Sequence, residues 1–419
     1  MSEPLSIAFV APPYGGHLFP QLQLAEGLRE NTGYDIHFYS TPEAEAAVRL
    51  SGFEFVAVLS KRSHEVIAIS DTPRRVGSNP LHLYRQFESN LALMAQLKSE
   101  LRERWEASRP ELVIADFTVP IAGLLASEMG VRWWTSMPTP CAMETGDGTP
   151  TYLGGWMPPT TVIGRIRDAA GRVLIRGFKR SVHRMFRRKL VELGVPRIYR
   201  DDGLEVIYSG ERVLAMGWRE FEFERNWPNA VQFIGPLTRS PSFDHVPPIF
   251  EEGKRHVLVS LGTHLWWAKG DARELVREVA RAMPDCVFHF SDGRHRDDSD
   301  VDYPVIDGNF HRYKYLPYDR YMDRYSAAIH HGGTGVMYCC LELGIAALVW
   351  PQDYDQFDHA ARLIHRGLGK RLRPNITQIV TDLRTLLQDS VIHERLREFQ
   401  EIARRYDPRN SLAQQIEPA

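Results

Sequence analysis

Short apolar runs alternate with longer segments of helical periodicity in the first half of the chain. Strands are predicted at four apolar runs, 6–11, 36–39, 111–115 and 133–136. Between them, helix-patterned segments cover 18–30, 42–51 and 119–130. This alternation is typical of parallel βαβ units, so we predict a doubly wound α/β domain here.

The same alternation begins again after a proline-rich, charge-bearing stretch at 236–255, which we interpret as a linker. Further strands are predicted at 256–261, 287–290, 327–330 and 346–349, with helices at 271–283, 335–343 and 355–366. We therefore expect an α/β protein with two Rossmann-like doubly wound domains. Ligands bind at the carboxyl ends of strands in open parallel sheets, so two such domains facing a central cleft would hold the chemistry there.

Length and composition agree with two folded domains. The 419 residues exceed one ordinary hydrophobic core, and 43% hydrophobic with 25% charged residues is the balance of a globular protein. Four cysteines, at 141, 286, 339 and 340, lack the spacing of a zinc site or a disulfide scaffold, which favours the cytoplasm. The N-terminal sequence reads as a first strand rather than a signal, and no run of about 18 apolar residues could span a bilayer.

One basic stretch departs from the near-neutral charge of the chain. The formal net charge is −2, so we expect no nucleic-acid partner. Within 161–192, however, ten Lys and Arg residues face only two acids and alternate with apolar residues at helical spacing. Three interpretations stay open: a peripheral contact with an anionic membrane, attraction of an acidic acceptor, or a solvated helix face that pairs with acids elsewhere.

A glycine-rich turn between a predicted strand and a predicted helix carries the strongest chemical signal. Its sequence is His331, Gly332, Gly333, Thr334, Gly335 and Val336. Glycines let the backbone approach a ligand closely, and the N–H groups at a helix N-terminus favour a diphosphate. A histidine at this turn can donate to a phosphate oxygen. Taken alone, the run would also fit an ordinary strand-to-helix turn.

A polar pair, Asp355 and Gln356, follows the next predicted strand. A carboxylate accepts hydrogen bonds, and a carboxamide both donates and accepts them. The pair therefore suits the hydroxyl groups of a sugar ring. In isolation it would also fit a helix cap.

Polar residues also follow two strands of the first half. Gly16 and His17 lie on the loop after the first predicted strand, and Asp116 closes the predicted strand at 111–115. Imidazole titrates near neutrality, which suits proton transfer. A carboxylate could hold its second nitrogen, although a strand-end aspartate also commonly caps a helix.

These motifs together resemble the UDP-glycosyltransferases, the family 1 glycosyltransferases with the GT-B fold, whose bacterial members glycosylate antibiotics, flavonoids, lipids and carotenoids. The stretch 331–356 is similar, without gaps, to the C-terminal signature of that family. Shorter matches at 235–237, 260–263 and 315–317 extend the resemblance over most of the chain.

The resemblance implies a particular domain order and reaction. An acceptor-binding domain would cover 1–238, a nucleotide-sugar-binding domain 239–394, and a C-terminal helix over 395–419 would pack back on the first domain. The implied reaction transfers a hexose from a UDP- or dTDP-sugar to a small, mostly apolar acceptor. It would be inverting and would use neither metal nor cofactor, with the nucleotide sugar as a co-substrate.

The resemblance also assigns roles to individual residues. It implies that His17 is the general base and that Asp116 orients it. The implied donor-binding residues are Gly16, Ser260, Gly262, Thr263, Tyr315, Leu316, His331, Gly332, Gly333, Thr334, Gly335, Val336, Asp355 and Gln356. Loops near the Asp116 helix line acceptor pockets in the family, and the candidates here are Trp133, Trp134, Met137, Met143, Tyr152 and Trp156, whose other interpretation is ordinary packing.

Four positions depart from the family pattern. Val336 replaces the Ser or Thr that usually follows the glycines, and Cys339 replaces the acidic residue that commonly holds the ribose. His359 replaces an asparagine that follows the Asp-Gln pair, and Tyr318 replaces a glutamine of the base-binding stretch. These departures keep two alternatives open. One is a catalytically weak nucleotide-sugar-binding protein that serves as a sensor or partner subunit, and the other is a sugar-nucleotide epimerase.

Overall fold

The computed structural model describes residues 5–71, 80–293, 303–412 and 416, which divide into two compact units. The first unit contains the described residues of 1–69, 77–237 and 407–419, and the second those of 70–76 and 238–406. Within the described residues, each unit has one seven-stranded sheet. In this part of the chain, no helix is both long and apolar enough to cross a membrane.

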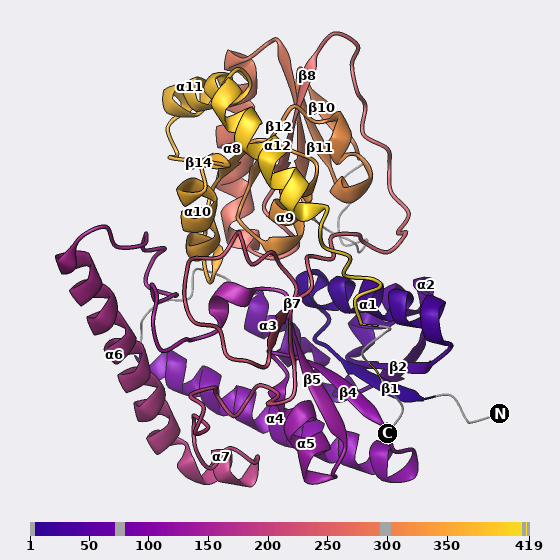
Figure 1. Ribbon diagram of the computed structural model, residues 1–419. Helices are drawn as coiled ribbons and strands as arrows, with labels where there is room; N and C mark the ends of the chain where they lie inside the picture. Colours follow the sequence, from indigo (N-terminus) through magenta and orange to yellow (C-terminus); the bar gives the residue numbers. More distant parts are fainter. Residues whose placement is uncertain (1–4, 72–79, 294–302, 413–415, 417–419) are drawn as a thin grey trace. The chain divides into compact units, whose positions relative to one another are not determined.

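The first unit is built on a parallel sheet in the order β3-β2-β1-β4-β5-β6-β7. Its strands are β1 (Ser6–Val10), β2 (Asp35–Ser40), β3 (Glu54–Ala57), β4 (Leu112–Asp116), β5 (Arg132–Met137), β6 (Val213–Ala215) and β7 (Val231–Phe233). Its α-helices are α1 (Gly15–Thr32), α2 (Glu45–Leu50), α3 (Ser63–Ser70), α4 (Pro80–Ala107), α5 (Pro120–Glu128), α6 (Val162–Met185) and α7 (Arg187–Glu192). Figure 1 shows α1 and α2 on one face of the sheet and α4 and α5 on the other. Burial on both faces explains why β1 and β4 are continuous apolar runs.

The chain reverses its direction across this sheet between β1 and β4. From β1 it moves outward to β2 and β3, and it then returns to form β4 on the other side of β1. The loops that follow β1 and β4 therefore leave the same edge in opposite directions. In doubly wound sheets this position is the usual ligand site.

The second unit repeats the arrangement in the order β10-β11-β9-β8-β12-β13-β14, with only the β10–β11 pair antiparallel. Its strands are β8 (Arg255–Ser260), β9 (Cys286–Ser291), β10 (Val305–Asp307), β11 (Phe310–Tyr313), β12 (Ala327–His330), β13 (Ala347–Val349) and β14 (Gly369–Arg371). Its α-helices are α8 (Trp266–Ala282), α9 (Thr334–Glu342), α10 (Gln356–His365), α11 (Ile376–Leu386) and α12 (Ser390–Ala403). Helix α8 packs with α11, and α9 packs with α12. The reversal point of this sheet lies between β8 and β12.

Short 3₁₀ turns complete the described elements: η1 (Pro42–Ala44), η2 (Ser60–Arg62), η3 (Pro140–Ala142), η4 (Tyr318–Arg320) and η5 (Met322–Arg324). The two parallel-dominated sheets confirm the predicted α/β class with two Rossmann-like domains.

The end of the chain differs from the helix predicted over 395–419. The last described helix, α12, begins at Ser390 and ends at Ala403, and it belongs to the second unit. The residues from Asp407 belong to the first unit, where the Arg409 guanidinium lies 3.3 Å from a Glu26 carboxylate oxygen and 3.1 Å from one of Glu30. Residues 413–415 and 417–419 of the predicted helix lie outside the described residues.

Candidate active site

The first unit joins two of the predicted site residues directly. His17 lies in the first turn of α1, immediately beyond β1, and Asp116 is the last residue of β4. The Nδ1 atom of His17 is 3.0 Å from Oδ1 and 3.1 Å from Oδ2 of Asp116. Asp116 is fully buried, whereas the His17 side chain is 23% exposed. The pair therefore spans the reversal point of the sheet, with the imidazole on the accessible side.

This geometry fixes which imidazole nitrogen carries the hydrogen. An ionised carboxylate only accepts hydrogen bonds, so Nδ1 of His17 donates to Asp116. In the neutral ring the lone pair is then on Nε2, which is the atom able to accept a proton. The structure thus brings together the two residues that the sequence analysis predicted to be a base and its orienting carboxylate, with the lone pair on the atom that such a base would use.

Neighbouring groups hold both members of this pair in place. The Asp116 Oδ1 atom also accepts bonds from the Thr118 backbone N–H at 2.9 Å and from the Thr118 hydroxyl at 2.5 Å. The Phe117 ring stacks on the His17 ring at 5.6 Å between centroids. Before α1, two prolines end the strand, and the Tyr14 hydroxyl donates to the Val66 carbonyl, which anchors the helix start.

In the second unit, His331 lies where two glycine turns meet. The turn after β8 contains Gly262, the turn after β12 contains Gly333, and a Cβ atom on either glycine would clash with the His331 ring. The closest approaches would be 2.8 Å from Gly262 to Cε1 and 2.3 Å from Gly333 to Nε2. The φ of +77° at Gly262 adds a second reason for glycine there. These turns flank the reversal point between β8 and β12.

The environment of His331 keeps its imidazole neutral near pH 7. Desolvation lowers the pKa of His331 to about 4, although the Ser260 backbone and the Asp355 carboxylate oppose the shift. Its Nδ1 lies 3.4 Å from the Ser260 carbonyl oxygen, which can only accept. The lone pair of the neutral ring is therefore on Nε2. An approaching anion would have to bring a proton onto this atom before the imidazole could donate to it.

The glycine run lies at the N-terminus of α9. Gly333 is the N-cap residue, and Thr334 and Gly335 form the first turn, where amides have no partner within the helix. Together with the helix dipole, such amides favour an anion. Val336 is the last predicted residue of the turn, and its side chain lies in the core, so only its backbone faces this end of the helix.

Lys269 is a candidate donor-site residue that the sequence analysis missed. It lies on α8 and is only 2% exposed. Its ammonium donates to the Gly262 carbonyl at 2.7 Å and to the Asp292 carbonyl at 2.5 Å, so it joins the turns after β8 and β9. A lysine on the inward face of an otherwise amphipathic helix is the signal that would have revealed it.

Asp355 and Gln356 begin α10 but have different surroundings. The Gln356 side chain is buried, and its Oε1 accepts the backbone N–H groups of Gln352 at 2.8 Å and Asp353 at 3.2 Å. Both acceptor positions of this oxygen are thus used within the loop. Asp355 is half-buried, makes no side-chain capping bond to α10, and interacts electrostatically with His331. The carboxylate is therefore better placed than the carboxamide oxygen to accept bonds from a ligand.

The positions that depart from the family pattern are mostly packed inside the second unit. Cys339 lies in the core, and His359 is fully buried, with its Nδ1 donating to the Gly332 carbonyl at 2.8 Å. Tyr318 differs, because its hydroxyl oxygen would lie 2.7 Å from a Cβ on Gly335. A hydroxyl group is therefore present beside the first turn of α9, although the residue after the glycines is valine.

A pocket of about 390 Å³ adjoins Tyr315, one of the predicted donor-binding residues. Tyr315 lines it, together with Phe243, Asp244, His245, Val246, Tyr303, Tyr313 and Lys314. The Tyr315 ring meets the Phe243 ring edge-on at 6.3 Å. The predicted Leu316 contact is different, because that side chain is buried in the core and its backbone N–H donates to Ser291 at 3.1 Å.

Most of the predicted acceptor contacts are buried. Trp134 and Met137 are fully buried, Trp133 packs in the core against α5, and Met143 lies in a second core cluster. The structure therefore favours the packing interpretation for these four residues. Tyr152 is 53% exposed. Trp156 is half-buried, and the Arg167 guanidinium lies 4.7 Å from the centroid of its ring.

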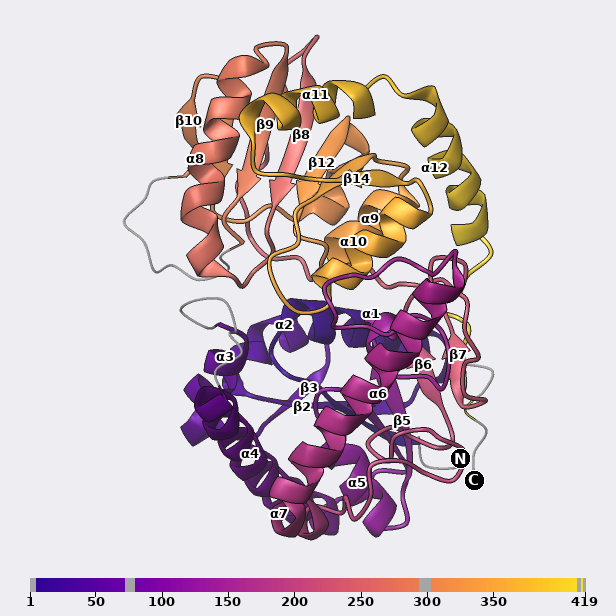
Figure 2. The same cartoon turned by 90° about the vertical axis from the view of Figure 1, so that its left-hand side faces the viewer.

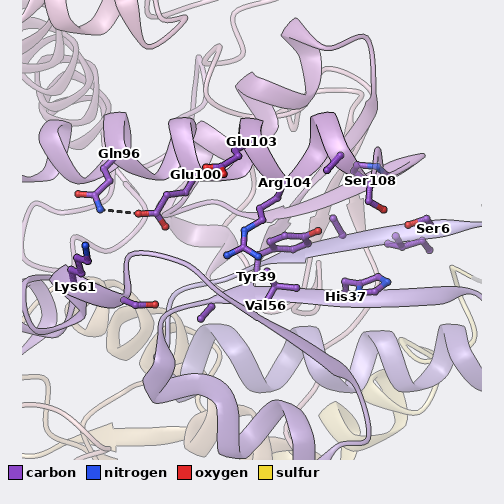
Figure 3. Close-up of a pocket in the computed structure, with 16 residues that line it drawn as sticks. Ser6, His37, Tyr39, Val56, Lys61, Gln96, Glu100, Glu103, Arg104 and Ser108 are labelled. Carbon is purple, nitrogen blue, oxygen red and sulfur yellow. Dashed lines mark hydrogen bonds between the residues drawn. The ribbon is translucent and has the colours of Figure 1, made fainter.

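A second cavity, of about 720 Å³, lies elsewhere in the first unit (Figure 3). It lies over β1, β2 and β3 and under the second half of α4, and its lining includes Tyr39, Glu100 and Arg104. His17 and Asp116 are not among the described residues that line it. This cavity is therefore separate from the candidate catalytic pair.

Comparisons with known proteins agree with the fold. Residues 273–409 match the family described as Erythromycin biosynthesis protein CIII-like, C-terminal domain. The chain is 24% identical to a zeaxanthin glucosyltransferase from Pseudescherichia vulneris, over 93% of this chain and 92% of that protein. Its fold matches the solved glycotransferase of kitacinnamycin with a TM-score of 0.74 and 23% identity, over 99% of this chain and 98% of that chain.

A further solved structure, the spinosyn rhamnosyltransferase SpnG, has a TM-score of 0.64 and 19% identity, over 99% of this chain and 100% of that chain. That protein has been solved with thymidine diphosphate and with the spinosyn aglycone.

These results define the protein as a glycosyltransferase with the GT-B fold. More particularly, residues 273–409 are similar to the EryCIII-like C-terminal domain, and the chain as a whole is similar to glycosyltransferases of natural-product biosynthesis.

Proposed function

We propose that this protein transfers a hexose from a UDP- or dTDP-sugar to a small, mostly apolar acceptor, by a metal-independent inverting mechanism. The observation that carries the proposal is the hydrogen-bonded pair of His17 and Asp116 at the reversal point of the first sheet. A protein that only binds nucleotide sugars has no need of a base held in this tautomer. Two of the proteins named above, a zeaxanthin glucosyltransferase and a rhamnosyltransferase solved with an aglycone, support an apolar acceptor.

In the proposed reaction, Nε2 of His17 takes the proton from the nucleophilic atom of the acceptor as that atom attacks the anomeric carbon. The bond from the anomeric carbon to the diphosphate oxygen breaks in the same displacement, and the nucleoside diphosphate leaves. Inversion follows because a single attack occurs from the face opposite the leaving group. The buried Asp116 carboxylate stabilises the imidazolium that forms.

The second unit would bind the donor. The first-turn amides of α9, together with the His331 imidazole once its Nε2 carries a proton, would stabilise the negative charge that grows on the departing diphosphate. Asp355 would accept bonds from the hexose hydroxyls. The buried Lys269 ammonium adds positive charge beneath the Gly262 turn, which compensates for the buried valine and cysteine. The pocket beside Tyr315 would hold the nucleobase.

A donor panel tests this function. Thermal unfolding is measured with UDP-, dTDP- and GDP-hexoses, because a ligand at 100 times its Kd stabilises the native state by about 2.7 kcal/mol. Release of nucleoside diphosphate is then measured with apolar hydroxylated acceptors. We expect a UDP- or dTDP-sugar both to stabilise the protein and to release its nucleotide only when an acceptor is present. Stabilisation without release under any acceptor would instead indicate a binding protein, and interconversion of the free nucleotide sugar would indicate an epimerase.

A further inference from the structure

Helix α6 exposes an apolar face to solvent, which is the reverse of the usual arrangement of a surface helix. Seven large apolar side chains along it are between 53% and 80% exposed, and they are Val162, Ile163, Ile166, Val173, Leu174, Phe178 and Met185. At about 3.6 residues per turn, these positions fall within about one half of the helix circumference. Figures 1 and 2 both show α6 on the outer surface of the first unit.

The inward face of α6 is the polar one. The buried Asp168 accepts a bond from Thr149 at 2.8 Å, and Lys179 donates to Glu144 at 2.8 Å and lies 2.9 Å from Glu205. Arg176 binds the same Glu144 carboxylate at 2.5 Å. Ionic contacts thus attach this helix to its unit, and its large apolar side chains face the solvent.

The inward cations Arg176 and Lys179 pair with the half-buried carboxylate of Glu144, and Lys179 also pairs with Glu205. Burial alone would raise the pKa of Glu144, but bonds from Arg176, Lys179 and Tyr199 outweigh it and lower the pKa. Glu144 is therefore ionised at neutral pH and is fully used by these partners. The inward cations have a structural role that leaves no charge to attract a ligand.

Other cations of the same segment are exposed. Among the described residues, Arg165, Arg180, Arg184 and Arg187 make no salt bridge, and all four are exposed. Two of them, Arg180 and Arg184, lie on the side of α6 that carries the apolar residues, toward its C-terminal end. The stretch 161–192 has ten Lys and Arg residues and two acids, within a chain whose net charge is −2. Positive charge is therefore concentrated around the apolar face.

From this combination we infer that α6 docks the protein onto the surface of an anionic lipid bilayer. An apolar face flanked by arginines is the composition of helices that lie in the membrane interface. The 24-residue helix is about 36 Å long, so its whole apolar side can enter the boundary of the acyl chains while the arginine heads reach the phosphate layer. Each such cation is attracted to the negative surface potential of an anionic bilayer.

A second copy of the chain fits this face less well. A two-fold interface presents the same surface from both copies, so the exposed arginines would meet the same arginines. Of the two acids in the segment, Asp168 is buried on the inward side of α6, and Glu192 at the end of α7 bonds Arg188 at 3.2 Å. The charge of the surface therefore favours an anionic partner over a second copy.

Vesicle co-sedimentation of the full chain tests the inference without any sugar substrate, so its outcome is independent of the proposed reaction. Partition is measured on phosphatidylcholine vesicles with and without about 30% phosphatidylglycerol, at low and high salt. One variant, Ile163→Ser with Leu174→Ser, removes apolar surface, and another, Arg180→Glu with Arg184→Glu, reverses charge. The matched controls are Leu50→Ser on α2, an apolar side chain that is 55% exposed, and Arg397→Glu with Arg405→Glu, which reverses two exposed arginines of the second unit.

We expect the wild-type protein to bind the anionic vesicles, to lose binding at high salt, and to bind pure phosphatidylcholine at least about tenfold more weakly. Both α6 variants should lower the partition by about tenfold or more, and both controls should leave it within twofold. Equal binding to the two vesicle types, or variants that bind like the wild type, would contradict the inference. So would a dimer in solution that the apolar α6 variant dissociates, because a second copy would then cover the face.

A second measurement does not depend on how well the variants fold. Hydrogen exchange of the wild-type protein should slow within 162–185 when anionic vesicles are added and should be unchanged with phosphatidylcholine alone. Slowing at other segments with none in α6 would overturn the assignment of the docking surface.

Discussion

The Nδ1 atom of His17 lies 3.0 Å from the Oδ1 atom of Asp116, across the point where the first sheet reverses its strand order. The two residues are 99 positions apart in the chain and meet only because β1 and β4 are neighbouring parallel strands. This contact fixes the orientation and the tautomer of a half-buried histidine in the first turn of α1. It is the structural relationship on which the proposed reaction depends.

Replacement of the carboxylate by its amide tests the orienting role. Asp116→Asn keeps the shape, but an amide nitrogen can donate to Nδ1 and stabilise the wrong tautomer. We expect kcat to fall by about 10²- to 10⁴-fold, with little change in donor affinity. Steady-state kinetics and donor titration measure both. Thr118→Val, which removes a hydroxyl bond to the same carboxylate, is the milder control, and a kcat of Asp116→Asn within threefold of wild type would refute the orienting role.

The contacts of His331 predict that an alanine at Gly262 or at Gly333 will weaken donor binding. In Gly333→Ala or Gly262→Ala, the new Cβ would lie 2.3 Å or 2.8 Å from atoms of the imidazole and would displace it. We expect donor affinity to fall by about tenfold or more, as is typical when a charged hydrogen bond worth about 1.5–3 kcal/mol is lost. Isothermal titration measures the change. Gly270→Ala is the matched control, since its Cβ would meet no atom within 4 Å, and loss of affinity in that variant alone would contradict the account.

Buried histidines of the second unit should make the protein sensitive to acid. Burial lowers the pKa of His289 and of His330 to about 3, and that of His331 to about 4. Because these values lie below the unfolded value of about 6.5, the unfolded state binds more protons below that pH. Stability is therefore full above pH 6.5 and falls progressively toward pH 4.

Urea unfolding at pH 7.5 and pH 5.0 measures this dependence. In His330→Asn, the amide oxygen can still accept the Gly332 N–H that now donates to Nδ1 at 3.1 Å, but it cannot titrate. We expect the variant to lose less free energy of unfolding between the two pH values than the wild type, by up to about 1.4 kcal/mol per pH unit. If both proteins lost the same free energy of unfolding, the pKa of His330 would be the same in the folded and unfolded states, which would contradict this prediction.

Substitutions of the two residues at the start of α10 should have different effects, one on substrate binding and the other on stability. Asp355→Ala removes a carboxylate that does not cap the helix, so we expect kcat/KM for the donor to fall by about 10- to 100-fold with little change in Tm. Gln356→Ala leaves the amides of Gln352 and Asp353 without their acceptor and should cost about 1–3 kcal/mol of stability. Kinetics and thermal unfolding of both variants decide the point, and the reverse pattern would contradict the assignment.

The sequence predicted the elements that carry strong periodicity. All eight predicted strands are present within one residue of their predicted ends, because buried parallel strands are continuous apolar runs between turn residues. Shorter or mixed strands were missed, including β3, whose residues are half-buried, and β11, which contains His311 and Arg312. In those strands packing between elements, rather than local pattern, decides the structure.

Within the candidate site, the resemblance supplied residue types but not their partners. The sequence led to the expectation that His17 and Asp116 form a pair, and the structure gives the distance and the tautomer. It gave no sign that Gln356 uses its oxygen inside its own loop or that Lys269 lies under the Gly262 turn. Such contacts join elements that are distant in the chain, so no local pattern records them.

The sequence likewise did not predict that the apolar face of α6 points outward. The spacing within 161–192 predicted an amphipathic helix, and the normal expectation would bury its apolar side. The ionic contacts of Asp168 and Lys179 show that the polar side faces inward. Only the three-dimensional structure could show the orientation, since either face of the same helix can be packed.

The most direct test of the central claim is the turnover of His17→Ala, measured as nucleoside diphosphate release with a productive donor and acceptor, beside a titration of the donor alone. The account predicts that turnover falls by at least about 10²-fold while the donor Kd stays within about twofold, with His37→Ala, a change at a partly exposed histidine of β2, active as wild type. Turnover by His17→Ala at the wild-type rate would contradict the account.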